Sequence, residues 1–209
     1  MKSKYSAIVF DLGNVLLNFD YQKVIRGFEN IASGLGNKFA DYYRQNYEVH
    51  RKFERGDYSG EQFTEIMLRV LENKVSKEEF YRIYSEIFTP NNELVAALPV
   101  LRQHYKLVIM SNTNSIHYQY GWKDFDFLKH FDKMILSYEV GSVKPEDKIY
   151  KAVESYTGVP PSEHFYTDDV LEYISAARQL GWDAAQFIDN ATLFSDFEKR
   201  SIVFRNESD

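Results

Sequence analysis

The 209-residue chain contains no cysteine, and this absence excludes disulfide bonds and thiolate metal sites. It also lacks a long apolar run. The first apolar stretch, residues 7–10, is too short for a signal peptide or a membrane span. We therefore expect a cytoplasmic protein without a membrane-spanning segment.

Basic clusters are missing as well, and the formal net charge is −6 at pH 7. A chain of that sign is a poor candidate for binding nucleic acid or an anionic membrane surface, so we expect neither partner. A phosphate group must then be held by a local site, because the overall field opposes it. The 16 Phe and 16 Tyr supply apolar side chains for a sizeable core, and only the polar tail, residues 206–209, looks disordered.

Five short apolar runs have the length of strands and are nearly continuous, as strands buried on both faces tend to be: residues 7–10, 107–110, 134–136, 164–166 and 184–188. Helical patterns separate most of them. One of these helices, around residues 94–101, contains Pro99, which should kink or restart it. Alternating strands and helices predict an α/β fold with a doubly wound parallel sheet.

Residues from about 21 to 88 show helical periodicity without convincing strands. Two apolar stripes begin at capping-box pairs, Ser59 with Gln62 and Ser76 with Glu79. Residues 89–92, which include Pro90, look like a linker back to the sheet. The sequence thus predicts a core made of residues 1–18 and 89–209, with a helical cap at 19–88 inserted after the first strand.

Polar side chains follow four of the predicted strands. Asp11 follows the first, Ser111 the second, Lys144 lies beyond the third, and Asp168 and Asp169 follow the fourth. Ligands of open α/β sheets bind beyond the carboxyl ends of the strands, so these side chains should converge. Each one alone has a commonplace explanation as a turn residue, a helix cap or a solvated loop. Their ordered occurrence at one edge favours a single site.

The chemistry of this set is coherent. Asp11 and Asp168 can share a hard divalent cation, most naturally Mg²⁺. Ser111 and Lys144 supply donors for phosphate oxygens, and the metal and the lysine together offset the charge of a phosphoryl-transfer transition state. Asp11 is then free to act as a nucleophile and form an aspartyl-phosphate.

Four segments resemble, in order, the four motifs of the haloacid dehalogenase-like hydrolases: IVFDLGNV at 8–15, LVIMSN at 107–112, KP at 144–145 and FYTDD at 165–169. The helical insert is similar to the type 1 cap of that superfamily. Residues 53–56 and 111–117 resemble a narrower branch, which contains sugar-1-phosphate phosphatases and the N-terminal domain of soluble epoxide hydrolases.

The resemblance implies that Asp11 is both the nucleophile and a magnesium ligand. It implies the Gly13 carbonyl and Asp168 as further metal ligands, with Asp169 orienting the metal shell. The same resemblance implies three residues that bind the phosphate: Ser111, Asn112 and Lys144.

Two positions depart from the family pattern. Related phosphatases usually have a second aspartate, a general acid and base, at the place of Gly13, and often an Asn near Tyr173. The Gly13 carbonyl can bind metal but cannot move a proton. The glucose-1-phosphatase branch also has Gly there. Either the substrate has a good leaving group, such as an anomeric or acyl phosphate, or another acid such as His117 replaces the aspartate. We favour the first alternative.

Two other functions compete with a phosphatase. A 2-haloacid dehalogenase uses an aspartate nucleophile without metal, but Asp168 and Asp169 would repel its nucleophile and its substrate carboxylate. A catalytically weak phosphate-binding or interaction protein had no need to retain Asp11, Ser111, Lys144 and Asp168. We therefore predict a magnesium-dependent phosphatase that acts on a small phosphorylated metabolite, with a sugar phosphate as the expected substrate, through an aspartyl-phosphate on Asp11.

The residues that choose the leaving group should lie in the cap. Glu54 and Arg55 are the candidates, and an exposed ion pair at a helix end is an equally good explanation of the two.

Overall fold

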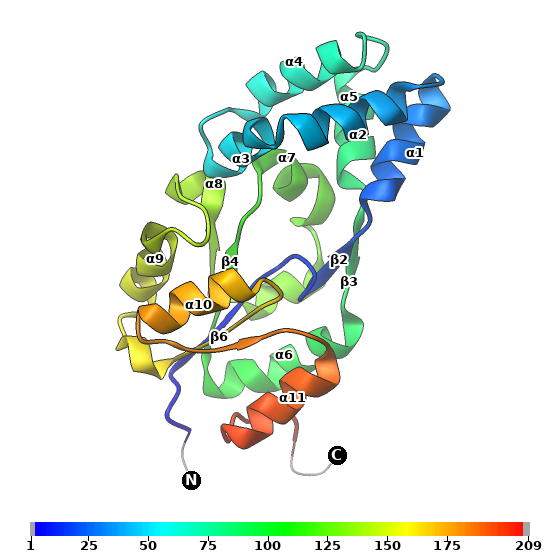
Figure 1. Ribbon diagram of the computed structural model, residues 1–209. Helices are drawn as coiled ribbons and strands as arrows, with labels where there is room; N and C mark the ends of the chain where they lie inside the picture. The colour runs from blue at the N-terminus through cyan, green and yellow to red at the C-terminus, as the bar shows by residue number, and fades with distance from the viewer. Residues whose placement is uncertain (1–2, 207–209) are drawn as a thin grey trace.

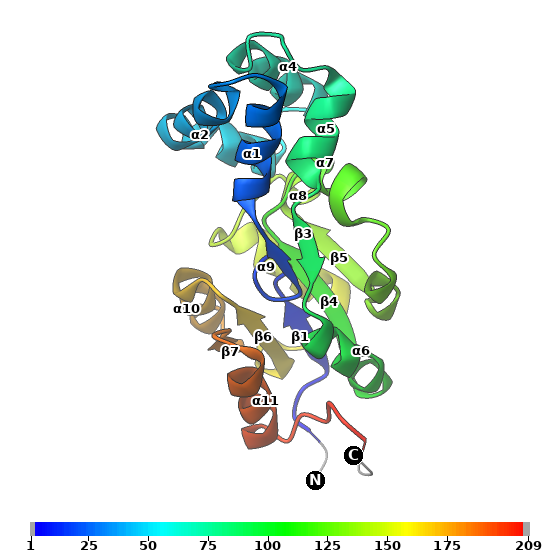
Figure 2. The same cartoon turned by 90° about the vertical axis from the view of Figure 1, so that its right-hand side faces the viewer.

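A five-stranded parallel sheet forms the centre of the computed structural model, which describes residues 3–206. Of the polar tail, residues 207–209 lie outside this range. The strand order is β5-β4-β1-β6-β7, with β1 in the middle (Figure 2). The bounds are Ala7–Phe10 (β1), Lys106–Ser111 (β4), Lys133–Leu136 (β5), His164–Asp168 (β6) and Asp183–Gln186 (β7). All five predicted strands and the doubly wound parallel sheet are confirmed.

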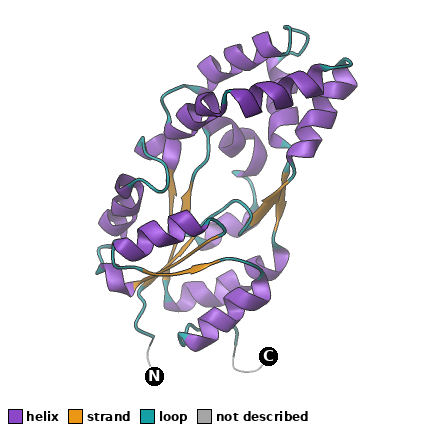
Figure 3. Ribbon diagram, viewed as in Figure 1, coloured by secondary structure: helices purple, strands orange, loops and turns teal. Residues whose placement is uncertain are grey.

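Helices cover both faces of this sheet (Figure 3). Because successive side chains of a strand point to opposite faces, the continuous apolar strands feed two separate cores. Ile8 and Phe10 pack with helices α6 (Asn92–His104) and α11 (Asn190–Lys199). Val9 packs with helices α9 (Asp147–Thr157) and α10 (Leu171–Gln179). This two-sided burial explains why the central strand β1 is apolar throughout.

The helical insert follows β1 and lies beyond the carboxyl edge of the sheet (Figure 1). It consists of α1 (Tyr21–Ile31), α2 (Leu35–Gln45), α3 (Tyr47–Arg55), α4 (Gly60–Val70) and α5 (Lys77–Ser85). Its buried aromatic residues form a third core, which includes Phe28, Phe39, Phe63, Phe80 and Tyr84. Both predicted capping boxes are present, at the starts of α4 and α5.

The helical insert is confirmed, but the predicted linker at 89–92 was wrong, because these residues include the end of a strand and the start of a helix. Strands β2 (Leu17–Phe19) and β3 (Phe88–Pro90) pair antiparallel and connect the insert to the sheet. Asn91 then caps α6, its side chain accepting from the Leu94 amide. Strands of three residues are too short to show an alternating pattern, and Pro90 is tolerated at the end of a two-stranded ribbon.

Helix α6 runs through Pro99 without a restart. Pro99 lies on the exposed side of the helix, where water can bind the carbonyl that the missing N–H leaves free. Shorter elements complete the described chain: α7 (Ser115–His117), a π-helical turn (Tyr118–Trp122), α8 (Ser137–Val140), and 3-10 helices at Asp126–His130 and Pro161–Glu163.

We propose the same division into a core of residues 1–18 and 89–209 and a cap of residues 19–88, because the third core is separate from the two that cover the sheet. Among residues 3–206, no helix has both the length and the apolar character needed to cross a bilayer.

Candidate active site

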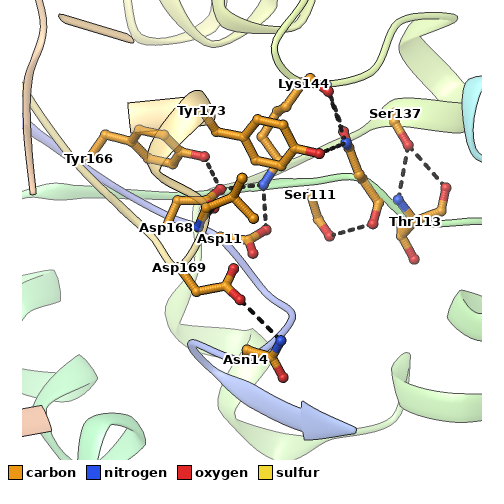
Figure 4. Close-up of polar contacts among 12 residues, drawn as sticks. Asp11, Asn14, Ser111, Thr113, Ser137, Lys144, Tyr166, Asp168, Asp169 and Tyr173 are labelled. Carbon is orange, nitrogen blue, oxygen red and sulfur yellow. Dashed lines mark hydrogen bonds and ion pairs between the residues drawn. The ribbon is translucent and has the colours of Figure 1, made fainter. Parts of the chain in front are cut away.

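Three of the predicted site residues lie where the central strands of the sheet end. Asp11 directly follows β1, Ser111 ends β4 and Asp168 ends β6. Since β1 pairs with both β4 and β6, their carboxyl ends meet at one edge. All three residues are buried. Figure 4 shows them together with Lys144, so the structure brings the residues of all four motifs to one place.

Lys144 bridges the two buried carboxylates. Its Nζ lies 2.6 Å from Asp11 Oδ1 and 2.6 Å from Asp168 Oδ2. Burial alone would lower the pKa of Lys144, but the two carboxylates outweigh it and raise this pKa. Burial raises the pKa of Asp11, although Lys144 opposes the rise. The lysine is therefore held as an ammonium, while Asp11 needs further positive charge to ionise fully.

The acidic side chains fit a divalent metal. One carboxylate oxygen from each of Asp11, Asp168 and Asp169 lies within 4.8 Å of the others. Three carboxylates beside one ammonium have a formal charge of −2, which a divalent cation would balance. Hard oxygen ligands are those that Mg²⁺ prefers. Asn14 donates to Asp169 Oδ2 at 3.0 Å and so orients the third carboxylate.

Tyr166, which the sequence analysis did not single out, supports Asp168. Its hydroxyl donates to Asp168 Oδ2, and the Val170 amide donates to Oδ1 at 2.8 Å. With Lys144 also bonded to Oδ2, the carboxylate is fixed from three sides. The two-residue spacing in β6 was the available signal, because residues i and i+2 of a strand lie on one face.

Asn112 holds the backbone of Lys144. The Lys144 amide donates to Asn112 Oδ1 at 2.7 Å, and Asn112 Nδ2 donates to the Lys144 carbonyl at 3.2 Å. Arg51, from helix α3 of the insert, donates to the same carbonyl at 2.6 Å. The ring of Tyr173 lies 5.1 Å from Lys144 Nζ. The unusual tyrosine thus contacts the lysine, and the Asn112 side chain positions the loop rather than pointing freely at a ligand.

A cavity of about 230 Å³ lies between the insert and the edge of the sheet. Gly13, Ser111, Asn112 and His117 of the core line it, together with aromatic residues of the insert. Glu54 also lines this cavity, as expected of a residue that faces the site. Arg55 instead pairs with Glu146 of the core. Glu54 therefore lines the cavity, whereas Arg55 takes part in an ion pair at the end of the helix.

Gly13 has little room for a side chain, since a Cβ there would lie 3.1 Å from the Phe19 ring. His117, the candidate substitute acid, is 6% exposed. Burial, together with the nearby His50, lowers the pKa of His117 to about 3. A ring that is neutral at neutral pH is a poor proton donor to a leaving group. The structure therefore argues against His117 as the general acid.

The sequence of this chain is similar to those of known enzymes. The D-ribitol-5-phosphate phosphatase of Bacteroides thetaiotaomicron is 24% identical over 189 residues, which cover 86% of this chain and 90% of that protein. Bifunctional epoxide hydrolase 2 of Rattus norvegicus is 35% identical over 71 residues, which cover 34% of this chain and 13% of that protein. Over these residues the predicted likeness to epoxide hydrolases is confirmed.

The structural match is broader. The crystal structure of a haloacid dehalogenase family enzyme from B. thetaiotaomicron has a TM-score of 0.78 and 29% identity, and the match covers 91% of this chain and 98% of that one. A complex of that enzyme contains magnesium and inorganic phosphate, and it matches with a TM-score of 0.75 and 26% identity.

The family model described as haloacid dehalogenase-like hydrolase matches residues 5–181, a span that begins just before β1 and ends after α10. It includes all the residues that meet at the sheet edge, as well as the inserted helices. The family resemblance predicted from the four motifs is confirmed, and this chain belongs to the haloacid dehalogenase-like hydrolases.

Proposed function

We propose that this protein is a magnesium-dependent phosphatase that hydrolyses a small phosphorylated metabolite, a sugar phosphate, through an aspartyl-phosphate on Asp11. The observation that carries the proposal is the buried cluster of Asp11, Lys144 and Asp168 beside a cavity between the insert and the sheet edge. A related phosphatase of a sugar-alcohol phosphate and a relative that binds magnesium and phosphate support it.

Asp11 and Asp168 would hold the metal, with the Gly13 carbonyl as a further ligand. Asp169 would orient the groups that surround the metal. When bound, Mg²⁺ supplies positive charge that stabilises the phosphoryl oxygens in the transition state. The three carboxylates are suited to hold the metal, because one oxygen of each lies within 4.8 Å of the others.

The protein's own groups then act on the phosphate. The Asp11 carboxylate forms a bond to phosphorus while the bond from phosphorus to the leaving-group oxygen breaks, and that oxygen takes a proton from water. A second water attacks the phosphorus, which releases inorganic phosphate and the free carboxylate. Lys144 keeps Asp11 in place and donates to phosphoryl oxygens, as does the Ser111 hydroxyl. Because the Asn112 side chain is bonded to Lys144, its contribution to phosphate would come from its backbone amide.

The dehalogenase alternative fits the site poorly. A haloacid carries a carboxylate, and Asp11 is surrounded by Asp168 and Asp169, with Glu54 in the cavity wall. Like charges at such a site disfavour an anionic substrate that brings no metal with it.

Three assays separate the alternatives: hydrolysis of p-nitrophenyl phosphate with Mg²⁺, the same with EDTA, and halide release from 2-chloropropionate. We expect phosphate ester hydrolysis that EDTA abolishes and added Mg²⁺ restores. Metal-free halide release would support a dehalogenase. Absence of both activities would support a binding protein.

A further inference from the structure

The walls of the cavity carry very little charge. Among the described residues that line it, Glu54 is the only acidic one, and there is no lysine or arginine. The remaining lining is mainly aromatic, with Tyr21, Tyr43 and Phe88 among its rings. A leaving group in this space would therefore meet one fixed carboxylate and mostly ring surfaces.

Glu54 is held in a defined orientation. Its side chain is 14% exposed, and its Oε1 lies 3.2 Å from His50 Nε2. Since a carboxylate only accepts hydrogen bonds, His50 Nε2 donates, and in the neutral ring His50 Nδ1 accepts from the Tyr84 hydroxyl at 3.3 Å. The carboxylate is thus an acceptor fixed by the insert, not a mobile surface group.

The residues that line the cavity also include donors. Asn114 Oδ1 accepts from the His117 amide at 2.9 Å, so Asn114 Nδ2 faces His117 Nδ1 at 3.1 Å. An amide nitrogen donates, so Nδ1 accepts and the neutral imidazole carries its proton on Nε2. Within the described part of the chain, His117 Nε2 and Trp122 Nε1 are buried without a partner. Both residues line the cavity. Buried N–H groups without acceptors are costly and rare, which points to a ligand that supplies oxygens.

We propose that the cavity selects an uncharged, polyhydroxylated leaving group and that Glu54 rejects leaving groups that carry a second anionic group. A hydroxyl both accepts and donates hydrogen bonds, so its chemistry matches the donors His117 Nε2–H and Trp122 Nε1–H as well as the acceptor Glu54. A carboxylate would be repelled by the like charge of Glu54. An ammonium would satisfy Glu54 but could not accept from either N–H group. This inference rests on the proposed phosphatase function.

Three phosphate esters with one three-carbon skeleton test the proposal: glycerol 3-phosphate, 3-phosphoglycerate and 2-amino-3-hydroxypropyl phosphate. All three are primary alkyl esters, so the missing acid at Gly13 affects them alike. In the wild-type enzyme with Mg²⁺, we expect kcat/KM for glycerol 3-phosphate to exceed that for each charged ester by at least about 10-fold. Equal or higher kcat/KM for either charged ester, or no turnover of glycerol 3-phosphate by an enzyme that cleaves p-nitrophenyl phosphate, overturns the inference.

Glu54→Gln removes the charge and keeps the shape. It should lower the preference for glycerol 3-phosphate over 3-phosphoglycerate by about 10-fold. Glu48→Gln is the matched control, because Glu48 is exposed on the same helix, and it should leave the preference unchanged. An unchanged preference in Glu54→Gln overturns the assignment of Glu54.

His117→Phe keeps a ring stacked on Tyr84, 4.2 Å away, and removes the donor. It should raise KM for glycerol 3-phosphate about 10-fold relative to KM for p-nitrophenyl phosphate, which lacks hydroxyl groups. An equal change for both substrates would show a merely structural role and overturn the donor assignment. Failure of the wild-type enzyme on p-nitrophenyl phosphate itself would instead overturn the proposed function.

Discussion

At the scale of single residues, the site depends on one ammonium shared between two buried carboxylates. Lys144 is 1% exposed and Asp168 is fully buried, so neither charge can be solvated by water if its partner is removed. Breaking such a pair typically costs about 3–5 kcal/mol because an uncompensated buried charge is left behind. Variants of these residues must therefore be checked for folding before their activity is interpreted.

Asp11→Asn tests the nucleophile. An amide neither attacks phosphorus well nor binds Mg²⁺ strongly, so kcat with p-nitrophenyl phosphate should fall by several orders of magnitude. Circular dichroism should show a folded protein, and Asp124→Asn, at an exposed position, should keep full activity. Near-normal turnover in Asp11→Asn would show that the mechanism is wrong.

Gly13 leads to a prediction about the leaving group. The usual general-acid benefit, about 10²–10⁴-fold, is absent unless another group supplies it. Since the low pKa of His117 argues against that residue, α-D-glucose 1-phosphate should be hydrolysed faster than D-glucose 6-phosphate. His117→Ala should preserve this ranking of the two isomers. Equal rates on both, together with a severe loss in His117→Ala, would show that His117 is the acid after all.

His117 also predicts how stability depends on pH. Its pKa is lowered from 6.5 to about 3 by burial, so the unfolded chain binds this proton more readily than the native protein does. The neutral His117 ring therefore makes its full contribution to the stability of the native state above pH 6.5. This contribution is lost as the pH falls from 6.5 toward 3. Between pH 7 and pH 4 this amounts to about 3 kcal/mol. Urea unfolding of wild type and His117→Phe should show a shallower pH dependence in the variant. Parallel curves would contradict the assignment.

At the scale of elements, helix α3 docks the insert on the core, at helix α8 and the Lys144 loop. Arg51 donates to the Lys144 carbonyl, and the Ser137 hydroxyl of α8 donates to the Glu54 carbonyl at 2.6 Å. The helix ends at Gly56, which has φ +86° and approaches Tyr138 closely. The same short segment thus carries Glu54 into the cavity and docks on the core.

Gly56→Ala tests this docking. A Cβ at Gly56 would lie 2.4 Å from the Tyr138 carbonyl oxygen, whereas a Cβ at Gly158, also at positive φ, meets nothing within 4 Å. Both substitutions incur the left-handed backbone cost of about 1–2 kcal/mol. Gly56→Ala should cost about 1–3 kcal/mol more because of the clash. Urea unfolding of the two variants measures the difference, and equal losses would mean that α3 moves away freely.

The elements that the sequence predicted share strong local signals. The strands of the sheet contain short apolar runs, and α4 and α5 begin with capping boxes. Strands β2 and β3 have three residues each and are paired across the whole insert, so no local pattern marks them. The site residues at the strand ends could be predicted, because the carboxyl ends of parallel strands meet at one edge of a sheet. The contact of Arg51 with Lys144 could not be predicted, since it joins a helix of the insert to a loop of the core 93 residues away in the sequence, and no local pattern encodes it.

At the scale of the whole molecule, the negative charge of the protein disfavours the binding of an anionic ligand. The net charge is −6, and three of the carboxylates that contribute to it are grouped at the site. Neither favours an approaching phosphate ester. A divalent cation neutralises the local charge at the place where a phosphate must lie, so metal binding should precede or accompany substrate binding and should also stabilise the folded state.

Magnesium should therefore raise the thermal unfolding temperature without any substrate. A ligand that binds only the native state stabilises it by about 2.7 kcal/mol at 100 times its Kd, which corresponds to a rise in Tm of about 5–10 °C for a domain of this size. Scanning calorimetry in EDTA and in MgCl₂, at matched ionic strength, measures the shift. Asp168→Asn should abolish it, because the remaining carboxylates hold less charge and one ligand is lost. A full shift in that variant would exclude Asp168 as a ligand, and no shift in the wild-type protein would argue against magnesium itself.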